Sequence, residues 1–120
     1  MSFKMVQPEQ MLPLTPAVFH VLLALADEDR HGYSIMQRVT QATEGQIKMG
    51  PGTLYGTIKR LLAVKMIEET VERPDPKLDD ERRRYYRLTV FGRRVLEAEV
   101  SRYSRTLKFA RACGAAPKFA

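Results

Sequence analysis

The segment that organises the rest of the chain is residues 50–62, which read GPGTLYGTIKRLL. Pro51 suits the first turn of a helix, and leucine and isoleucine then recur at the period of a helix that is buried on one side. The predicted outer face combines small, hydrogen-bonding and cationic residues without an acid: Gly52, Thr53, Gly56, Lys59, Arg60 and Ala63, with Tyr55 and Thr57 on its flanks. A major groove admits such a helix with side chains at the base edges, and an ordinary solvated surface is the alternative. The predicted DNA-binding residues of this helix are Thr53, Tyr55, Gly56, Thr57, Lys59 and Arg60. Of these, Thr53, Lys59 and Arg60 are expected to contact bases or phosphates.

Two further helices are predicted upstream of this segment. Thr15 and Pro16 supply a capping side chain and a proline at the first helical position, and apolar residues continue at helical spacing to Leu25. A second helix opens with His-Gly-Tyr at residues 31–33 and ends within residues 40–45, which are poor in helix formers. Residues 46–49 are expected to form a short strand that leads into the central helix. The pattern predicts a helix-turn-helix core with a widened turn.

A β-hairpin is predicted after the central helix. Residues 66–72 and 81–88 have the composition and parity of two strands, with Tyr86 and Leu88 facing inward, and prolines and aspartates mark the turn between the strands. Near its tip, Arg82, Arg83 and Arg84 are expected to neutralise phosphates or to enter a minor groove. The alternative is pairing with the neighbouring acids Asp79, Asp80 and Glu81, although exposed pairs contribute little.

The last helix is predicted from residue 90 to about residue 113, capped by Thr89. Its apolar positions Leu96, Val100, Tyr103 and Leu107 follow a heptad spacing. Some 24 residues of helix span about 36 Å, which is longer than the small domain before it can cover. We therefore expect these residues to form a two-fold dimer with a second copy, and packing back onto the same domain is the alternative.

Composition and charge favour an anionic partner. Of 120 residues with a net charge of +6, residues 1–50 hold four Lys/Arg and five Asp/Glu, whereas residues 51–120 hold sixteen and nine. Nucleic acid is the commonest partner of a basic domain of this kind. The lack of a signal pattern, of an apolar run long enough for a bilayer, and of a second cysteine beside Cys113 favours the cytoplasm.

The expected organisation is mainly α with a small β-hairpin, that is, a winged helix-turn-helix with a long C-terminal dimerisation helix. It divides into an N-terminal arm (1–13) that gains order only by docking, a DNA-binding domain (14–89), a dimerisation helix (90–113) and a frayed tail (114–120). An enzyme is not expected, because no nucleophile or metal spacing accompanies His20, His31 and Cys113, and structural roles suit these three. No catalytic residue, metal or cofactor is therefore predicted.

The chain resembles PadR-type transcriptional regulators of the short kind with a single terminal helix, over about residues 14–111. The resemblance implies a winged helix, a homodimer, repression at an inverted-repeat operator, and a phenolic or hydrophobic effector that weakens DNA binding. It is carried by Leu14-Thr15-Pro16 with Leu22 and Leu25, His31-Gly32-Tyr33, Gly52-Thr53-Leu54-Tyr55, Arg60-Leu61, Met66-Ile67, and Arg83-Arg84-Tyr85-Tyr86-Arg87-Leu88-Thr89 followed by Gly92.

Three positions depart from the family pattern. Gly56 stands where proline is usual, Leu62 where an acid is frequent, and Lys65 where glycine commonly closes the helix. Because a left-handed conformation is costly for lysine, the central helix is expected to end differently from the family pattern.

The resulting prediction is a dimeric, sequence-specific DNA-binding regulator, a repressor relieved by a small molecule. The alternative is a winged-helix module that binds an acidic protein partner without DNA. Phe19, Tyr103 and Phe109 are candidates for an effector cavity beside the terminal helix, with ordinary core packing as the alternative reading.

Overall fold

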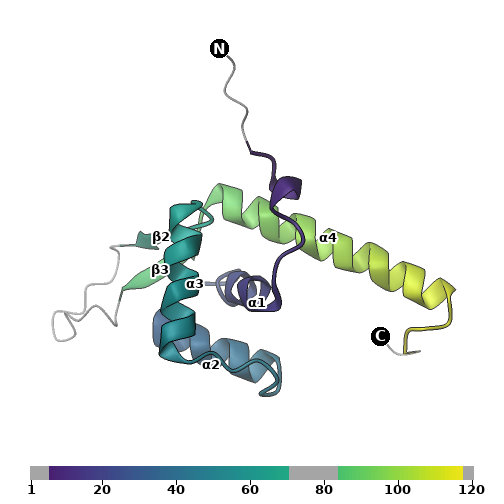
Figure 1. Ribbon diagram of the computed structural model, residues 1–120, viewed down its shortest axis with the longest axis horizontal. Helices are drawn as coiled ribbons and strands as arrows, with labels where there is room; N and C mark the ends of the chain where they lie inside the picture. Colours follow the sequence, from purple (N-terminus) through teal and green to yellow (C-terminus); the bar gives the residue numbers. More distant parts are fainter. Residues whose placement is uncertain (1–5, 71–83, 118–120) are drawn as a thin grey trace, which may run out of the picture.

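Helix α3 (Pro51–Ala63) stands between a small sheet on one side and the other helices on the other (Figure 1). The computed structural model describes residues 6–70 and 84–117. The remaining elements are η1 (Pro8–Met11), α1 (Pro16–Ala24), β1 (Arg30–His31), α2 (Gly32–Ala42), β2 (Ile67–Thr70), β3 (Tyr85–Leu88) and α4 (Val90–Ala112). The predicted class, mainly α with a small β-sheet, is confirmed.

Side-chain caps set the starts of three helices. Thr15 Oγ1 accepts a hydrogen bond from the Val18 amide at 3.3 Å, and Thr89 Oγ1 accepts one from the Gly92 amide at 2.9 Å. His31 Nδ1 accepts a hydrogen bond from the Ser34 amide at 3.1 Å and so caps α2. These side chains satisfy amides that have no partner within the helix, and α1 and α4 begin where the sequence predicts.

The sheet has the order β1-β3-β2 and is antiparallel throughout. In the hairpin, Ile67 lies opposite Leu88, and Tyr86 is buried as predicted. The prediction of a strand at residues 46–49 is wrong, because the third strand is Arg30–His31, which pairs with β3. Residues 46–49 contribute Met49 to the core instead and pair with no strand.

Hydrogen bonds between residues 65–66 and Thr89 form a joint that connects the end of α3 with the start of α4. Lys65 has a φ of 61°, and the Met66 amide bonds to Leu61 O at 3.0 Å, which closes α3 in a Schellman motif with lysine in the left-handed position. The expectation that Lys65 would prevent this ending is wrong. Tertiary contacts offset the cost: Thr89 donates its hydroxyl to Lys65 O at 2.6 Å and its amide to Met66 O at 3.1 Å.

The N-terminal arm packs on its own chain over the residues that the structure describes. Helix η1 lies against α4, and Met11 and Leu12 pack against the core. The Leu14 amide donates a 2.7 Å hydrogen bond to the fully buried Glu99 of α4. The described part of the arm, residues 6–13, therefore docks on its own chain.

Candidate nucleic-acid interface

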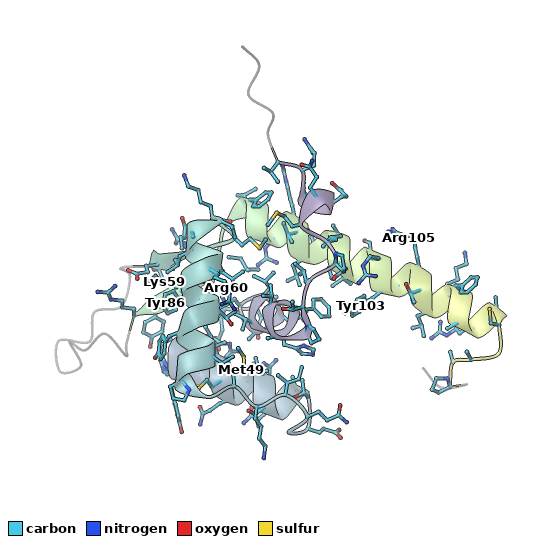
Figure 2. The ribbon with its side chains drawn as sticks, in the orientation of Figure 1. Met49, Lys59, Arg60, Tyr86, Tyr103 and Arg105 are labelled. Carbon is cyan, nitrogen blue, oxygen red and sulfur yellow. The ribbon has the colours of Figure 1, made fainter. Side chains whose placement is uncertain are left out.

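The outer face of α3 is exposed and basic. Leu54, Ile58 and Leu61 are buried at 0 to 3% exposure, whereas Thr53, Lys59 and Arg60 are exposed. Figure 2 labels Lys59 and Arg60 on this helix and Tyr86 on β3. Because α3 contains no acid, no carboxylate on the helix itself offsets the two cations.

Thr57 does not lie on that outer face. Its side chain is 1% exposed, because it lies three residues after Leu54 and four before Leu61 and so shares their buried stripe. The Thr57 hydroxyl donates to Thr53 O at 2.8 Å and accepts from Arg60 Nη2 at 3.3 Å. The prediction that Thr57 is a direct DNA contact is therefore wrong.

Tyr55 is half-buried and serves the contact between α2 and α3. A Cβ built on Gly32 would stand 2.7 Å from Tyr55 Oη, so the tyrosine occupies the space that glycine leaves at the start of α2. Only part of Tyr55 remains available to a partner.

The glycines of α3 lie in a different environment from Gly32. No atom lies within 4 Å of a Cβ built on Gly52, and only Arg60 Nη1, at 3.9 Å, approaches one built on Gly56. Because Gly52 and Gly56 carry no side chain, the backbone of α3 can approach a partner closely at these positions.

The strands of the hairpin lie beside α3, where a wing is expected (Figure 1). Arg84 Nη1 pairs with Glu69 Oε1 at 3.1 Å and Arg87 Nε with Glu68 Oε1 at 2.9 Å, both across the sheet and exposed. Arg84 thus forms its ion pair with Glu69 of the facing strand β2. Arg82, Arg83 and the acids weighed as their alternative partners, Asp79, Asp80 and Glu81, lie outside the described residues.

The four predicted dimerisation residues of α4 lie in two different environments, one of them buried and three exposed. Leu96 is 4% exposed in the core of its own chain, so assigning it to a dimer contact is wrong. Val100, Tyr103 and Leu107 remain 45, 41 and 37% exposed. The C-terminal part of α4 projects beyond the other elements (Figure 1).

The structure brings two of the three effector candidates together. Phe19 is buried and its ring lies 4.7 Å from that of Tyr103 in an edge contact. Phe109 is 71% exposed, six residues further along α4.

Glu99 is the residue that the sequence interpretation missed. Arg102, which hydrogen-bonds both carboxylate oxygens, lowers the pKa of Glu99 below its ordinary value, with help from the Leu14 amide and against the opposing effect of burial. An acid three residues after Leu96, within the apolar stripe of a helix, was the available signal.

The profile of the transcriptional regulator PadR-like family matches residues 21–98, which is more than half of the chain. The chain belongs to the PadR-like family.

Several proteins and solved structures resemble this PadR-like chain. An uncharacterized 37.1 kDa protein of transposon Tn4556 from Streptomyces fradiae is 36% identical over 85 residues, 71% of this chain but only 22% of that protein. An uncharacterized protein X from Lysinibacillus sphaericus is 29% identical over 84 residues, 70% of this chain and 74% of that protein.

The solved structures share the fold of this PadR-like chain at low sequence identity. A PadR family regulator from Clostridium difficile superposes with a TM-score of 0.64 at 22% identity, covering 82% of this chain and 97% of the other. Bacillus subtilis PadR in complex with operator DNA superposes with a TM-score of 0.61 at 19% identity, and the match covers 73% of this chain and 48% of the other.

The family consists of transcriptional regulators, and the histidines of this PadR-like chain have structural partners. His20 Nδ1 lies 2.8 Å from Pro16 O, and His31 caps α2. Within residues 6–70 and 84–117, no three His, Cys, Asp or Glu side chains gather into a metal-ligand set. Over the same part of the chain, no helix is long and apolar enough to cross a membrane.

Proposed function

We propose that this chain is a homodimeric, sequence-specific DNA-binding repressor that acts in the cytoplasm and inserts α3 into a major groove. The acid-free outer face of α3, in a chain of the PadR-like family, is the observation that carries the proposal. A groove about 12 Å wide admits one helix, and this face presents hydrogen-bonding groups and two cations to it.

Each exposed group has a proposed role. Thr53, Lys59 and Arg60 contact base edges or phosphates, while Gly52 and Gly56 let the backbone approach. The exposed part of Tyr55 flanks that contact. Arg84 of the wing, with Arg82 and Arg83, binds the flanking DNA backbone, because phosphates compete well with an exposed ion pair.

The dimer is proposed to form through the projecting part of α4. Val100, Tyr103 and Leu107 present an apolar stripe that a second copy can cover by two-fold symmetry. The same symmetry relates two α3 helices, so the operator is expected to be an inverted repeat with half-sites about 34 Å apart, or a multiple of that distance.

Relief of repression is assigned to a hydrophobic or phenolic effector beside the Phe19 and Tyr103 rings, where α1 meets the start of the projecting helix. Phe109 would border such a site only from further along α4, or from the second copy. An effector there regulates DNA binding only if it distinguishes two spacings of the α3 helices.

Selection of bound fragments from random DNA duplexes tests the proposal. The purified wild-type protein is expected to enrich a palindromic consensus. Binding to an acidic protein that unrelated duplex DNA does not compete away, without enrichment of any sequence, would reject it in favour of a protein-interaction module.

The salt dependence of operator binding tests the role of α3. Lys59→Ala should flatten the plot of log affinity against log salt by about one unit of slope, because one phosphate contact is lost. Lys108→Ala removes the same charge from the far end of α4 and serves as the matched control. Equal salt-dependence slopes for Lys59→Ala and Lys108→Ala would show that Lys59 does not contact the DNA.

A further inference from the structure

A hydrogen-bonded relay runs along α3 beneath its exposed face. The Thr57 hydroxyl donates its proton to Thr53 O at 2.8 Å, so its oxygen is left only as an acceptor. Arg60 Nη2 donates to that oxygen at 3.3 Å. Thr57 is itself 1% exposed and fixed in the core, so one end of the relay is rigid.

The relay holds one edge of the Arg60 guanidinium against the helix. Arg60 Nη1 lies 3.9 Å from the point where a Cβ on Gly56 would stand, so the group extends over the glycine. A guanidinium carries five donors in a planar fork, and Thr57 engages one of its terminal nitrogens. Donors remain for the paired O6 and N7 acceptors of a guanine in the major groove.

We propose that Thr57 is a positioning residue that aims Arg60 at a guanine edge, and that Arg60 determines the base preference at one position of each half-site. The inference rests on the proposed function, since it requires α3 in a major groove. Its physical basis is preorganisation: a side chain already held in one rotamer loses less conformational freedom on binding.

A merely structural role for Thr57 predicts different behaviour. If the Thr57 hydroxyl served only to donate a hydrogen bond to Thr53 O, its removal would change the free energy of unfolding and leave the base preference unchanged. Thr106 supplies the matched control, because its hydroxyl makes the same bond to the carbonyl four residues earlier, Arg102 O, at 3.0 Å, on exposed α4.

The experiment repeats the selection from random duplexes with Thr57→Val, Thr57→Ser, Arg60→Ala and Thr106→Val. Thr57→Val keeps the shape and removes the hydroxyl, and it should lower the preference for guanine at one position about two- to tenfold. Arg60→Ala should lower the preference at the same position by about five- to 150-fold. Thr57→Ser should restore the wild-type preference, and Thr106→Val should keep it.

Combining Thr57→Val with Arg60→Ala should produce no loss beyond Arg60→Ala alone, because Thr57 acts through Arg60. Thermal melting checks that each variant folds, and Thr57→Ala replaces Thr57→Val if the valine variant does not fold. An unchanged preference in folded Thr57→Val, or a uniform loss of affinity in Arg60→Ala without a change of consensus, overturns the inference. Failure of the wild-type protein to select any sequence would instead reject the proposed function.

Discussion

The two halves of α4 lie in opposite environments although one apolar pattern runs through both. In residues 90–99, Val95, Leu96 and Glu99 are buried at 0 to 4% exposure within their own domain. In residues 100–112, Val100, Tyr103 and Leu107 are 37 to 45% exposed. A heptad pattern therefore identifies which side of a helix is apolar, but the neighbouring elements decide what covers it.

The boundary between the two halves is an electrostatic connection. Glu99 accepts hydrogen bonds from the Leu14 amide and from Arg102, and Arg102 also lies over the Tyr103 ring, 5.1 Å from its centroid. Arg102 thus connects Glu99, at the end of the anchored half of α4 (residues 90–99), with Tyr103 of the projecting half (residues 100–112), and Glu99 connects both with Leu14, which follows the N-terminal arm.

The largest expected effect concerns the anchored half. A Cβ at Gly92 would stand 1.8 Å from Met66 O, a backbone atom that cannot move aside cheaply. Gly92→Ala should lower the free energy of unfolding by about 3–5 kcal/mol, measured by urea denaturation at fixed protein concentration. Gly52→Ala, in open space on α3, is the control and should raise stability by about 0.5–1 kcal/mol.

The next effect concerns the projecting half. In the proposed homodimer, Tyr103→Glu combined with Leu107→Glu should weaken association at least about a hundredfold, because apolar burial is replaced by buried charge. Sedimentation at micromolar concentration measures the mass. Glutamate at Ser101 and Arg105, exposed on the other side of α4, should leave the dimer intact. If the variant with glutamate at Tyr103 and Leu107 still sediments as a dimer, the exposed stripe of α4 does not form the dimer contact and packs without a second copy.

A smaller effect is expected at the boundary. Glu99→Gln should lower the free energy of unfolding by about 1–3 kcal/mol at pH 7, since a charge-assisted hydrogen bond is lost. The pKa of Glu99 is lowered from 4.5, so its contribution is complete above that pH and is lost as the pH falls through the folded pKa. The gap between wild-type and variant stability should therefore shrink in acid. Glu97→Gln, at an exposed position of the same helix, is the control and should leave the free energy of unfolding at pH 7 nearly unchanged.

The smallest effect tests the joint that anchors α4. Lys65→Gly should raise the free energy of unfolding by about 0.5–1 kcal/mol, because glycine adopts a φ of 61° without steric cost. Lys59→Gly, at a helical φ within α3, should lower it by about 1 kcal/mol. Equal signs for the two substitutions in thermal melting would contradict this account of the α3 ending.

Local chemistry predicted the helices and the hairpin well, because caps and alternation act over a few residues. Thr15 and Thr89 mark their helix starts, and Tyr86 faces inward as its parity requires. Strand β1 was not predictable, since two residues carry no period and Arg30–His31 becomes a strand only by pairing with β3. For the candidate site, the outer face of α3 was readable, and the spacing of Thr57 from Leu54 and Leu61 was an available signal for its burial, although the prediction placed Thr57 at the flank of the outer face.

The sequence by itself determined that α3 has one apolar face and one acid-free basic face, and that a long helix follows the hairpin, because these properties depend on side-chain order along a regular backbone. The tertiary structure alone decided that Leu96 belongs to the domain core and that Glu99 of α4 accepts a hydrogen bond from the Leu14 amide. Each of these outcomes depends on which surfaces meet across distant segments, and a local pattern does not contain that information.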